Sequence, residues 1–295
     1  MRIGITTSNY FRFGGSDRGF EDMKRDGWDV CDYSDITQTD TELFELSEAA
    51  FERHILADAA AARNAGIGIY QTHGPWRYPP RDATKEDRAE RFEKMCRDIS
   101  ATKLLGAKYM VIHPVMPWGC GAPPCAEEYM DVNREFFSRL IPVAEKEGVV
   151  IAFENMPMPL LPLGTPEEIT DFVREMASPC FRACLDTGHA AVITQDPTKM
   201  SLRAAKGVRV MGKEYLTCLH VHDNDGERDL HMYPFTGVTD FMAFADALRE
   251  IGYEGPLTLE CGVDNKPGLP EELKREHLRL LVRTARVIAD RADVK

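Results

Sequence analysis

The stretch CLHVHDNDGERDLH, residues 218–231, places three histidines and four carboxylates within fourteen positions. An alternating apolar run from Tyr215 to Val221 leads into it, which predicts a buried strand whose end opens into a polar loop. Because side chains alternate along a strand, His220 and His222 are expected on one side of it, about 6–7 Å apart. Imidazoles beside carboxylates suit a divalent metal such as Zn, Mn or Fe. A surface loop with solvated charges is the alternative interpretation.

Outward from this stretch, short apolar runs alternate with longer amphipathic ones along the whole chain. Strands are predicted at 2–7, 28–33, 67–73, 108–113, 149–154, 181–186, 216–222 and 257–261. Helices are predicted at 41–65, 85–105, 126–146, 166–176, 197–215, 239–251 and 271–292. Eight strands with helices between most of them predict an α/β fold, a single (β/α)8 TIM barrel. With no internal repeat or linker in the sequence, one domain over residues 1–295 is the simplest organisation.

The amino-acid composition restricts the classes of protein to which the chain can belong. Apolar residues make up 43% and charged residues 28% of the chain, as in a soluble globule with a sizeable core. The longest apolar runs are only of strand length, so neither a membrane span nor a signal peptide is predicted, and a cytoplasmic location is expected. Eight scattered cysteines are interpreted as free thiols in a reducing compartment. The net charge of −12 argues against a nucleic-acid partner.

The active site of such a barrel lies at the C-terminal ends of its strands. A lone histidine there is more often a core residue, but six consecutive predicted strands end in a potential metal ligand. In chain order these residues are His73, His113, Glu154, Asp186 with His189, His220 with His222, and Glu260. Carboxylates from the fifth, sixth and eighth strands and an imidazole from the seventh give three oxygens and one nitrogen at one point. Such a set suits Mn, Mg, Co or Zn and leaves coordination positions open for a substrate.

This donor set indicates carbonyl chemistry on a sugar. A bound ion would polarise the carbonyl and stabilise an enediolate, while a carboxylate takes the proton from the neighbouring carbon. Trp76 and Trp118 each follow a strand-end histidine, and could either form apolar walls for the sugar or pack under a loop.

Five motifs carry a family resemblance over nearly the whole chain: FEN at 153–155, DTGH at 186–189, HVHDND at 220–225, DLH at 229–231 and LE at 259–260. With them the chain resembles the xylose isomerase-like TIM-barrel superfamily. Those proteins are sugar isomerases, sugar-phosphate isomerases and epimerases, and they include apurinic endonucleases that use three zinc ions. The ketose 3-epimerases of this superfamily have a His-x-Gly-Glu pattern on the seventh strand. The sequence here, His220-Val-His-Asp223, departs from it and disfavours 3-epimerisation of free ketohexoses.

The resemblance implies one divalent ion (Mn, Co, Mg or Zn) and a division of roles among the site residues. The implied ligands are Glu154, Asp186, His220 and Glu260. Glu154 and Glu260 would also form the acid/base pair, and His189 would contact a substrate oxygen. By their positions His73, His113, His222, Trp76 and Trp118 are further candidates for substrate contacts, and Asp229 and His231 for further metal ligands. The expected partner is a small-molecule sugar, with no nucleic acid and no membrane, and the chain is a candidate homo-oligomer.

Three alternatives stay open. A three-zinc apurinic endonuclease would need nine ligands, and all nine are in the sequence: His73, His113, Glu154, Asp186, His189, His220, Asp229, His231 and Glu260. The net charge of −12 and the lack of an evident basic or aromatic DNA-reading loop favour the sugar hypothesis. A metal-dependent lyase on an oxidised glycoside would use the same proton abstraction. A non-enzymatic sugar-binding barrel is disfavoured by the complete ligand set.

Overall fold

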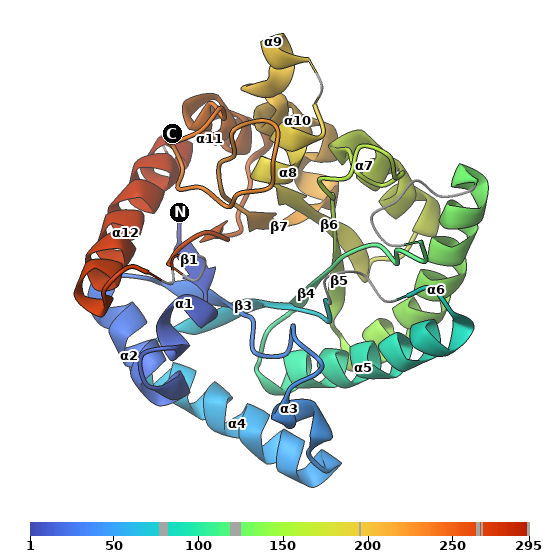
Figure 1. Ribbon diagram of the computed structural model, residues 1–295, viewed down its shortest axis with the longest axis horizontal. Coiled ribbons are helices and arrows are strands. Elements are labelled where there is room, and N and C mark those ends of the chain that lie inside the picture. The colour runs from blue at the N-terminus through green and yellow to red at the C-terminus, as the bar shows by residue number, and fades with distance from the viewer. Residues whose placement is uncertain (77–81, 119–124, 195, 264–265, 267, 294–295) are drawn as a thin grey trace.

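Eight parallel strands form a ring that is surrounded by helices (Figure 1). The computed structural model describes residues 1–76, 82–118, 125–194, 196–263, 266 and 268–293. The strands are β1 (Ile3–Thr6), β2 (Val30–Tyr33), β3 (Gly68–His73), β4 (Tyr109–Ile112), β5 (Val150–Glu154), β6 (Phe181–Asp186), β7 (Leu216–His220) and β8 (Leu257–Leu259). Their order in the sheet is β7-β6-β5-β4-β3-β2-β1-β8. The predicted (β/α)8 barrel is therefore confirmed.

The ring closes between β7 and β8 through few contacts. Val221 and Leu259 form an isolated parallel bridge just beyond the end of β7. Val221 donates its backbone N–H to the carbonyl of Thr258 at 2.9 Å, and Glu260 donates its own to the carbonyl of Val221 at 3.1 Å. Every other neighbouring pair of strands has a register of three or four residue pairs. The β7–β8 seam is thus the weakest part of the sheet.

The helices follow the strands and cover the outside of the barrel. They are α1 (Ser8–Phe11), α2 (Gly15–Asp26), α3 (Glu42–Glu45), α4 (Glu48–Ala65), α5 (Lys85–Leu104), α6 (Ala126–Glu147), α7 (Pro166–Met176), α8 (Thr187–Val192), α9 (Pro197–Met200), α10 (Arg203–Tyr215), α11 (Phe241–Ile251) and α12 (Glu271–Asp293). Thr165 caps α7 in a box with Glu168, as its sequence predicts. Gly66, Gly148 and Gly252 end α4, α6 and α11 in the left-handed conformation.

Four local predictions were wrong. Helices α1 and α2 fill the connection between the first two strands, where none was predicted. The predicted helix 41–65 is two helices, because the backbone is extended at Leu46 between α3 and α4. The predicted helix 197–215 is likewise split into α9 and α10. Strand β7 ends at His220 and not at His222, because its partner β6 ends at Asp186, which pairs with His220. Val221 then forms an isolated bridge to Leu259, and Asp223 pairs antiparallel with Met232.

The core lies in two layers. Inside the barrel Val111, Ala152, Cys184 and Cys218 pack together below the strand ends. Outside it, rings of Phe137, Phe153, Phe172 and Phe181 pack between the sheet and the helices at centroid distances of 4.9–6.4 Å. Such close packing fixes the strand ends on which the site is built.

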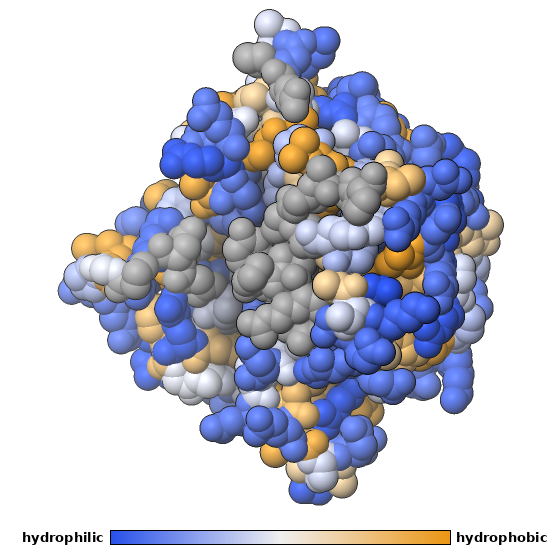
Figure 2. All heavy atoms as spheres, turned by 45° about the vertical axis from the view of Figure 1, so that its right-hand side comes forward, coloured by the Kyte–Doolittle hydropathy of each residue, from blue (hydrophilic) through white to orange (hydrophobic). Residues whose placement is uncertain are grey.

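The polarity of the surface and the state of the cysteines are those expected from the amino-acid composition. Polar side chains dominate the face drawn in Figure 2, with apolar ones scattered among them. The seven cysteines that the structure describes carry free thiols, and Cys120 lies outside the described residues. Within those residues, no helix has the length and apolar character to cross a lipid bilayer.

Candidate metal centre

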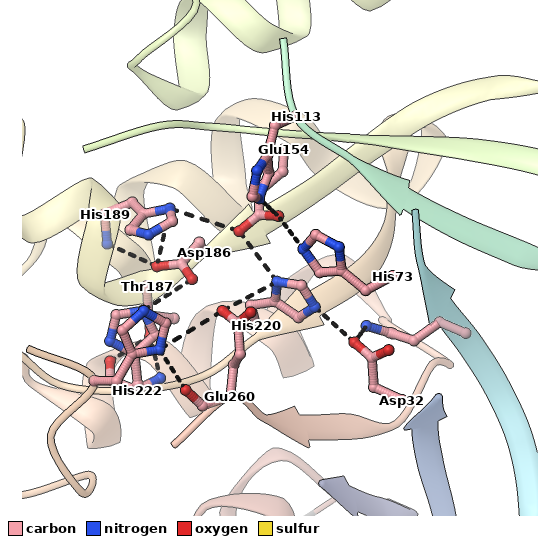
Figure 3. Close-up of polar contacts among 12 residues, drawn as sticks. Asp32, His73, His113, Glu154, Asp186, Thr187, His189, His220, His222 and Glu260 are labelled. Atoms are coloured by element: carbon pink, nitrogen blue, oxygen red, sulfur yellow. Dashed lines mark hydrogen bonds and ion pairs between the residues drawn. The ribbon is translucent and has the colours of Figure 1, made fainter. Parts of the chain in front are cut away.

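Glu154, the last residue of β5, lies at the centre of a buried cluster of imidazoles and carboxylates (Figure 3). Its Oε2 is 3.0 Å from His113 Nε2 and 3.9 Å from His73 Nε2. Its Oε1 is 3.1 Å from His220 Nδ1. Each oxygen of this one carboxylate therefore faces a different set of nitrogens, as in a carboxylate that bridges two sites.

The four predicted metal ligands come together. Glu154, Asp186, His220 and Glu260 each offer one ligand atom, and these atoms lie within 4.8 Å of one another. His220 Nδ1 is 3.3 Å from Glu260 Oε2 as well as 3.1 Å from Glu154. These four residues are called the central group below. Their convergence follows from the topology, because they end the neighbouring strands β5, β6 and β7 or directly follow β8.

Two further groups flank the central group. On one side His73 and His113 share Glu154, and on the other His189, His222, Asp229 and His231 form a histidine-rich group. Asp229 Oδ2 lies 3.3 Å from His189 Nε2 and 3.4 Å from His231 Nε2. The ring of His222 stacks on that of His231 at 4.0 Å, and its Nε2 is 2.9 Å from Asp186 Oδ2. His220 and His222 therefore both lie beside Asp186, and His222 is also part of the histidine-rich group.

Backbone carbonyls fix the orientation of three of these imidazoles. The Nδ1–H groups donate from His73 to Gly74 at 2.9 Å, from His189 to Asn155 at 2.8 Å and from His231 to Glu260 at 2.6 Å. Since a carbonyl oxygen only accepts, Nε2 of the neutral ring keeps its lone pair, and this atom faces the carboxylates. Metal-bound histidines commonly have this arrangement.

A carboxylate that the sequence analysis missed holds the fourth imidazole. Asp32, fully buried one residue before the end of β2, lies with its Oδ2 2.8 Å from His220 Nε2 (Figure 3). The same oxygen accepts a hydrogen bond from Gln71 Nε2 at 2.9 Å. The available signal was a charged residue inside a predicted buried strand.

The donor set fits a divalent cation. Glu260 Oε2 is buried and has no hydrogen-bond partner among the described residues, although it lies beside other carboxylates. Burial raises the pKa of Glu260, whereas burial of Glu154 is outweighed by His220 and His113, which hold its pKa well below the usual range. Burial lowers the pKa of His231, but Asp229 and Glu260 together raise it to about 10. Mixed oxygen and nitrogen ligands around a concentration of negative charge suit Mn, Co or Zn.

The loop after β7 is folded around Asp223. This fully buried carboxylate accepts backbone N–H groups from Asn224 at 3.0 Å, Gly237 at 2.7 Å and Thr239 at 3.0 Å. In the same loop, His231 has a φ of 45°, which is uncommon for a residue other than glycine. The loop thus holds the ring of His231 in place at the cost of local backbone strain.

A cavity of about 460 Å³ opens above the cluster. Of the predicted site residues, His73, Trp76, His113, His189, Asp229, His231 and Glu260 line it. Polar residues of the first two strand ends (Thr6, Ser8, Asn9, Ser34, Thr37, Gln38), the run 156–158 after β5, and Cys261 and Gly262 complete the lining. Sequence reasoning missed these, because nothing local marks them.

Two predicted substrate contacts are corrected by this geometry. Trp118 is absent from the described lining, and its ring packs on Tyr129 of α6 at 6.3 Å. His222 is fully buried behind His231 and does not reach the cavity. Trp76 does line it, with its ring edge-on to His113 at 4.4 Å.

Comparison with known proteins agrees with the fold. The chain is 27% identical over 205 residues to the uncharacterised protein MJ1311 of Methanocaldococcus jannaschii, covering 68% of this chain and 67% of that one. It is 23% identical over 209 residues to a probable endonuclease 4 of Mycoplasmopsis agalactiae, covering 68% and 72%. A crystal structure of D-psicose 3-epimerase in the presence of D-fructose shares the fold with a TM-score of 0.75, 16% identity and coverage of 98% and 99%.

The model of one protein family matches residues 22–284, which includes all the ligand groups described above. This chain therefore belongs to the xylose isomerase-like TIM-barrel family.

Proposed function

We propose that the protein is a metal-dependent sugar isomerase or epimerase. The observation that supports this most is the central group, in which Glu154 and Glu260 approach one point from different strands beside a cavity of about 460 Å³. A cavity of that size suits a small ligand. The fold that this chain shares with D-psicose 3-epimerase is in keeping with the proposal.

The residues divide the chemistry between them. A divalent ion held by the central group would supply charge that polarises a sugar carbonyl. Glu260, whose side chain is 18% exposed and lines the cavity, takes the proton from the carbon next to that carbonyl. Glu154 carries the second carboxylate of the acid/base pair. His73 and His113 line the same cavity and are placed to hydrogen-bond sugar oxygens.

The lining favours an uncharged sugar. None of the described residues that line the cavity is a lysine or an arginine. Hydroxyl groups of Thr6, Ser34 and Thr37 lie on one side, and the side chains of Trp76 and Met158 add apolar surface. A phosphate group would need a cationic or backbone cradle. We therefore expect turnover of free ketoses, aldoses or glycosides in preference to sugar phosphates.

The test combines metal analysis with a substrate screen. Protein purified without added metal or chelator is expected to hold about one Mn, Co, Mg or Zn per chain, and to interconvert at least one sugar of the screen. Release of an aglycone from an oxidised glycoside would instead indicate the lyase reaction. Loss of the ion in Asp186→Asn, with the fold intact, is expected because that variant removes one ligand. Unchanged metal content in that variant would contradict the assignment.

A second candidate is a zinc-dependent endonuclease that cleaves DNA at abasic sites. The observation that favours it is that the ligand atoms form several overlapping groups, with Glu154 shared between the central group and the His73–His113 pair. The likeness to a protein named probable endonuclease 4 points the same way. This candidate requires about three zinc ions per chain and cleavage of an abasic-site duplex, which the same metal analysis and one further assay measure.

A further inference from the structure

Asp32 is a buried carboxylate that lies behind the central group and not in it. It lies one residue before the end of β2, and its partner in β3 is Gln71. Its side chain is fully buried, and no lysine or arginine of the described chain forms an ion pair with it. Its polar neighbours are the imidazole of His220, at 2.8 Å, and the amide of Gln71, at 2.9 Å. A buried charge with so few partners is costly, so its position needs a reason.

The contact with His220 differs from those of the other oriented histidines. The rings of His73, His189 and His231 donate to neutral carbonyl groups, whereas His220 contacts a carboxylate. Because an ionised carboxylate only accepts, Nε2 of His220 carries the hydrogen and Nδ1 of the neutral ring keeps its lone pair. That nitrogen faces Glu154 at 3.1 Å and Glu260 at 3.3 Å. A carboxylate behind an imidazole also makes the ring a stronger metal ligand.

The charge is unevenly shared among the three groups. The central group contains three carboxylates, from Glu154, Asp186 and Glu260, and Asp32 adds a fourth behind its histidine. The histidine-rich group contains one carboxylate, that of Asp229, and its His222 also contacts Asp186 of the central group. The His73–His113 pair shares Glu154, and His73 is also grouped with Glu260. Attraction of a cation rises with nearby negative charge, and most strongly where water is excluded.

We propose that Asp32 is a positioning residue that fixes His220 as an Nδ1 ligand and makes the central group the first to take up a divalent ion. Gln71 holds the carboxylate of Asp32 in the required orientation through its amide hydrogen bond. The inference rests on the proposed function in one respect, namely that the central group binds a metal ion.

The test is a titration of the metal-free full-length protein with Mn²⁺, in which free Mn²⁺ is measured by electron paramagnetic resonance. The variants are Asp32→Asn, which keeps an acceptor oxygen without the charge, and Asp32→Ala, which removes both. Asp98→Asn is the matched control, since Asp98 is a fully buried carboxylate on α5 outside the three groups. The first Mn²⁺ is expected to bind about 10- to 100-fold more weakly to the Asp32 variants, and more weakly to the alanine than to the asparagine variant.

Cobalt adds a readout that a purely structural role would not change. In the wild type, the first equivalent of Co²⁺ should show the weak visible absorption of an oxygen-rich site. In Asp32→Asn, part of the first equivalent should move to the histidine-rich group and shift the spectrum toward that of a nitrogen-rich site. Asp98→Asn should retain the wild-type spectrum.

Two results would overturn the inference in different ways. If both Asp32 variants bind the first Mn²⁺ as tightly as Asp98→Asn does, Asp32 has no role in the central group, while the proposed function stands. If Asp186→Asn, which lacks a ligand of that group, also binds the first Mn²⁺ with wild-type affinity, the central group is not the metal site. The proposed function and the inference about Asp32 then both fail.

Discussion

Glu260 differs from the other carboxylates of the central group in its exposure. Its side chain is 18% exposed and lines the cavity, whereas Glu154 and Asp186 are fully buried beneath. Its Oε2 has no hydrogen bond within the described part of the chain. Since Oε2 is buried beside His220 Nδ1, at 3.3 Å, the exposed part of the carboxylate is where a proton from a bound sugar would be accepted.

Replacing Glu260 with Gln is therefore expected to lower kcat by about 10²- to 10⁴-fold or more, because the amide can neither accept the proton nor supply the negative charge. Glu254→Gln is the control, since the side chain of Glu254 is 81% exposed and pairs with Lys213 at 2.6 Å, and Glu254 precedes β8 whereas Glu260 follows it. Wild-type rates in Glu260→Gln on the sugar identified by the screen would contradict the mechanism.

Asp35 gives a pH-dependent prediction about stability. Burial raises its pKa to about 6, with a further contribution from Asp58 that His54 partly offsets. The folded protein thus holds this proton more tightly than the unfolded chain, and stability is lost as pH rises through the range from 3.8 to about 6. Asp35→Asn is expected to raise the free energy of unfolding at pH 8 and to have little effect near pH 4. Urea unfolding at several pH values measures this, and a difference that does not change with pH would count against it.

Among the elements, the loop between β7 and α11 depends most on a single residue. Asp223 accepts three backbone N–H groups at 2.7–3.0 Å, from both ends of the loop that carries Asp229 and His231. Asn224 adds a fourth hydrogen bond from a side chain to the backbone of the loop, because its Oδ1 accepts the N–H of Leu230 at 2.7 Å. The HVHDND motif thus combines possible ligands with the residues that fold their loop.

Asp223→Ala leaves these N–H groups without their acceptor, at a cost of about 1–3 kcal/mol for each one that stays buried. We expect faster hydrogen exchange over residues 224–239 and unchanged exchange in α6, measured by mass spectrometry. Glu227→Ala is the control in the same loop, because Glu227 is exposed. Equal exchange in the two variants would show that Asp223 does not hold the loop.

The strands also show how much of the fold can be predicted from the sequence. Strands of a parallel barrel are buried on both faces, so their continuous apolar runs are visible locally, and the barrel topology then brings their ends together. The end of β7 was misplaced because the apolar alternation continues to His222, whereas its pairing with β6 stops at His220. Asp32 was missed because its partner His220 lies 188 positions away. No local pattern reports a contact of that kind.

Across the whole molecule, the ligands tie together strands that lie far apart in sequence. The central group alone joins residues of β5, β6 and β7 and the residue after β8. An ion bound there would act on the folded state only, since the unfolded chain does not assemble these four side chains.

Removal of metal is accordingly expected to lower the Tm. At a free-ion concentration of about 100 times Kd, one bound ion adds about 2.7 kcal/mol to the free energy of unfolding. Calorimetry before and after dialysis against a chelator measures the shift, and adding back Mn²⁺ should restore it. Asp186→Asn should show a smaller shift than the wild type, and an equal shift would place the ion elsewhere.

The weak closure between β7 and β8 has a kinetic consequence. His220 and Glu260 lie on the two sides of that seam, where the backbone pairing consists of one bridge with two hydrogen bonds. Transient opening of the barrel should therefore begin there, and the amides of Val221 and Glu260 should be among the first of the sheet to lose protection. A ligand that bridges His220 and Glu260 would hold β7 and β8 together. The rate at which this seam opens, measured by hydrogen exchange, would therefore report whether the site is filled.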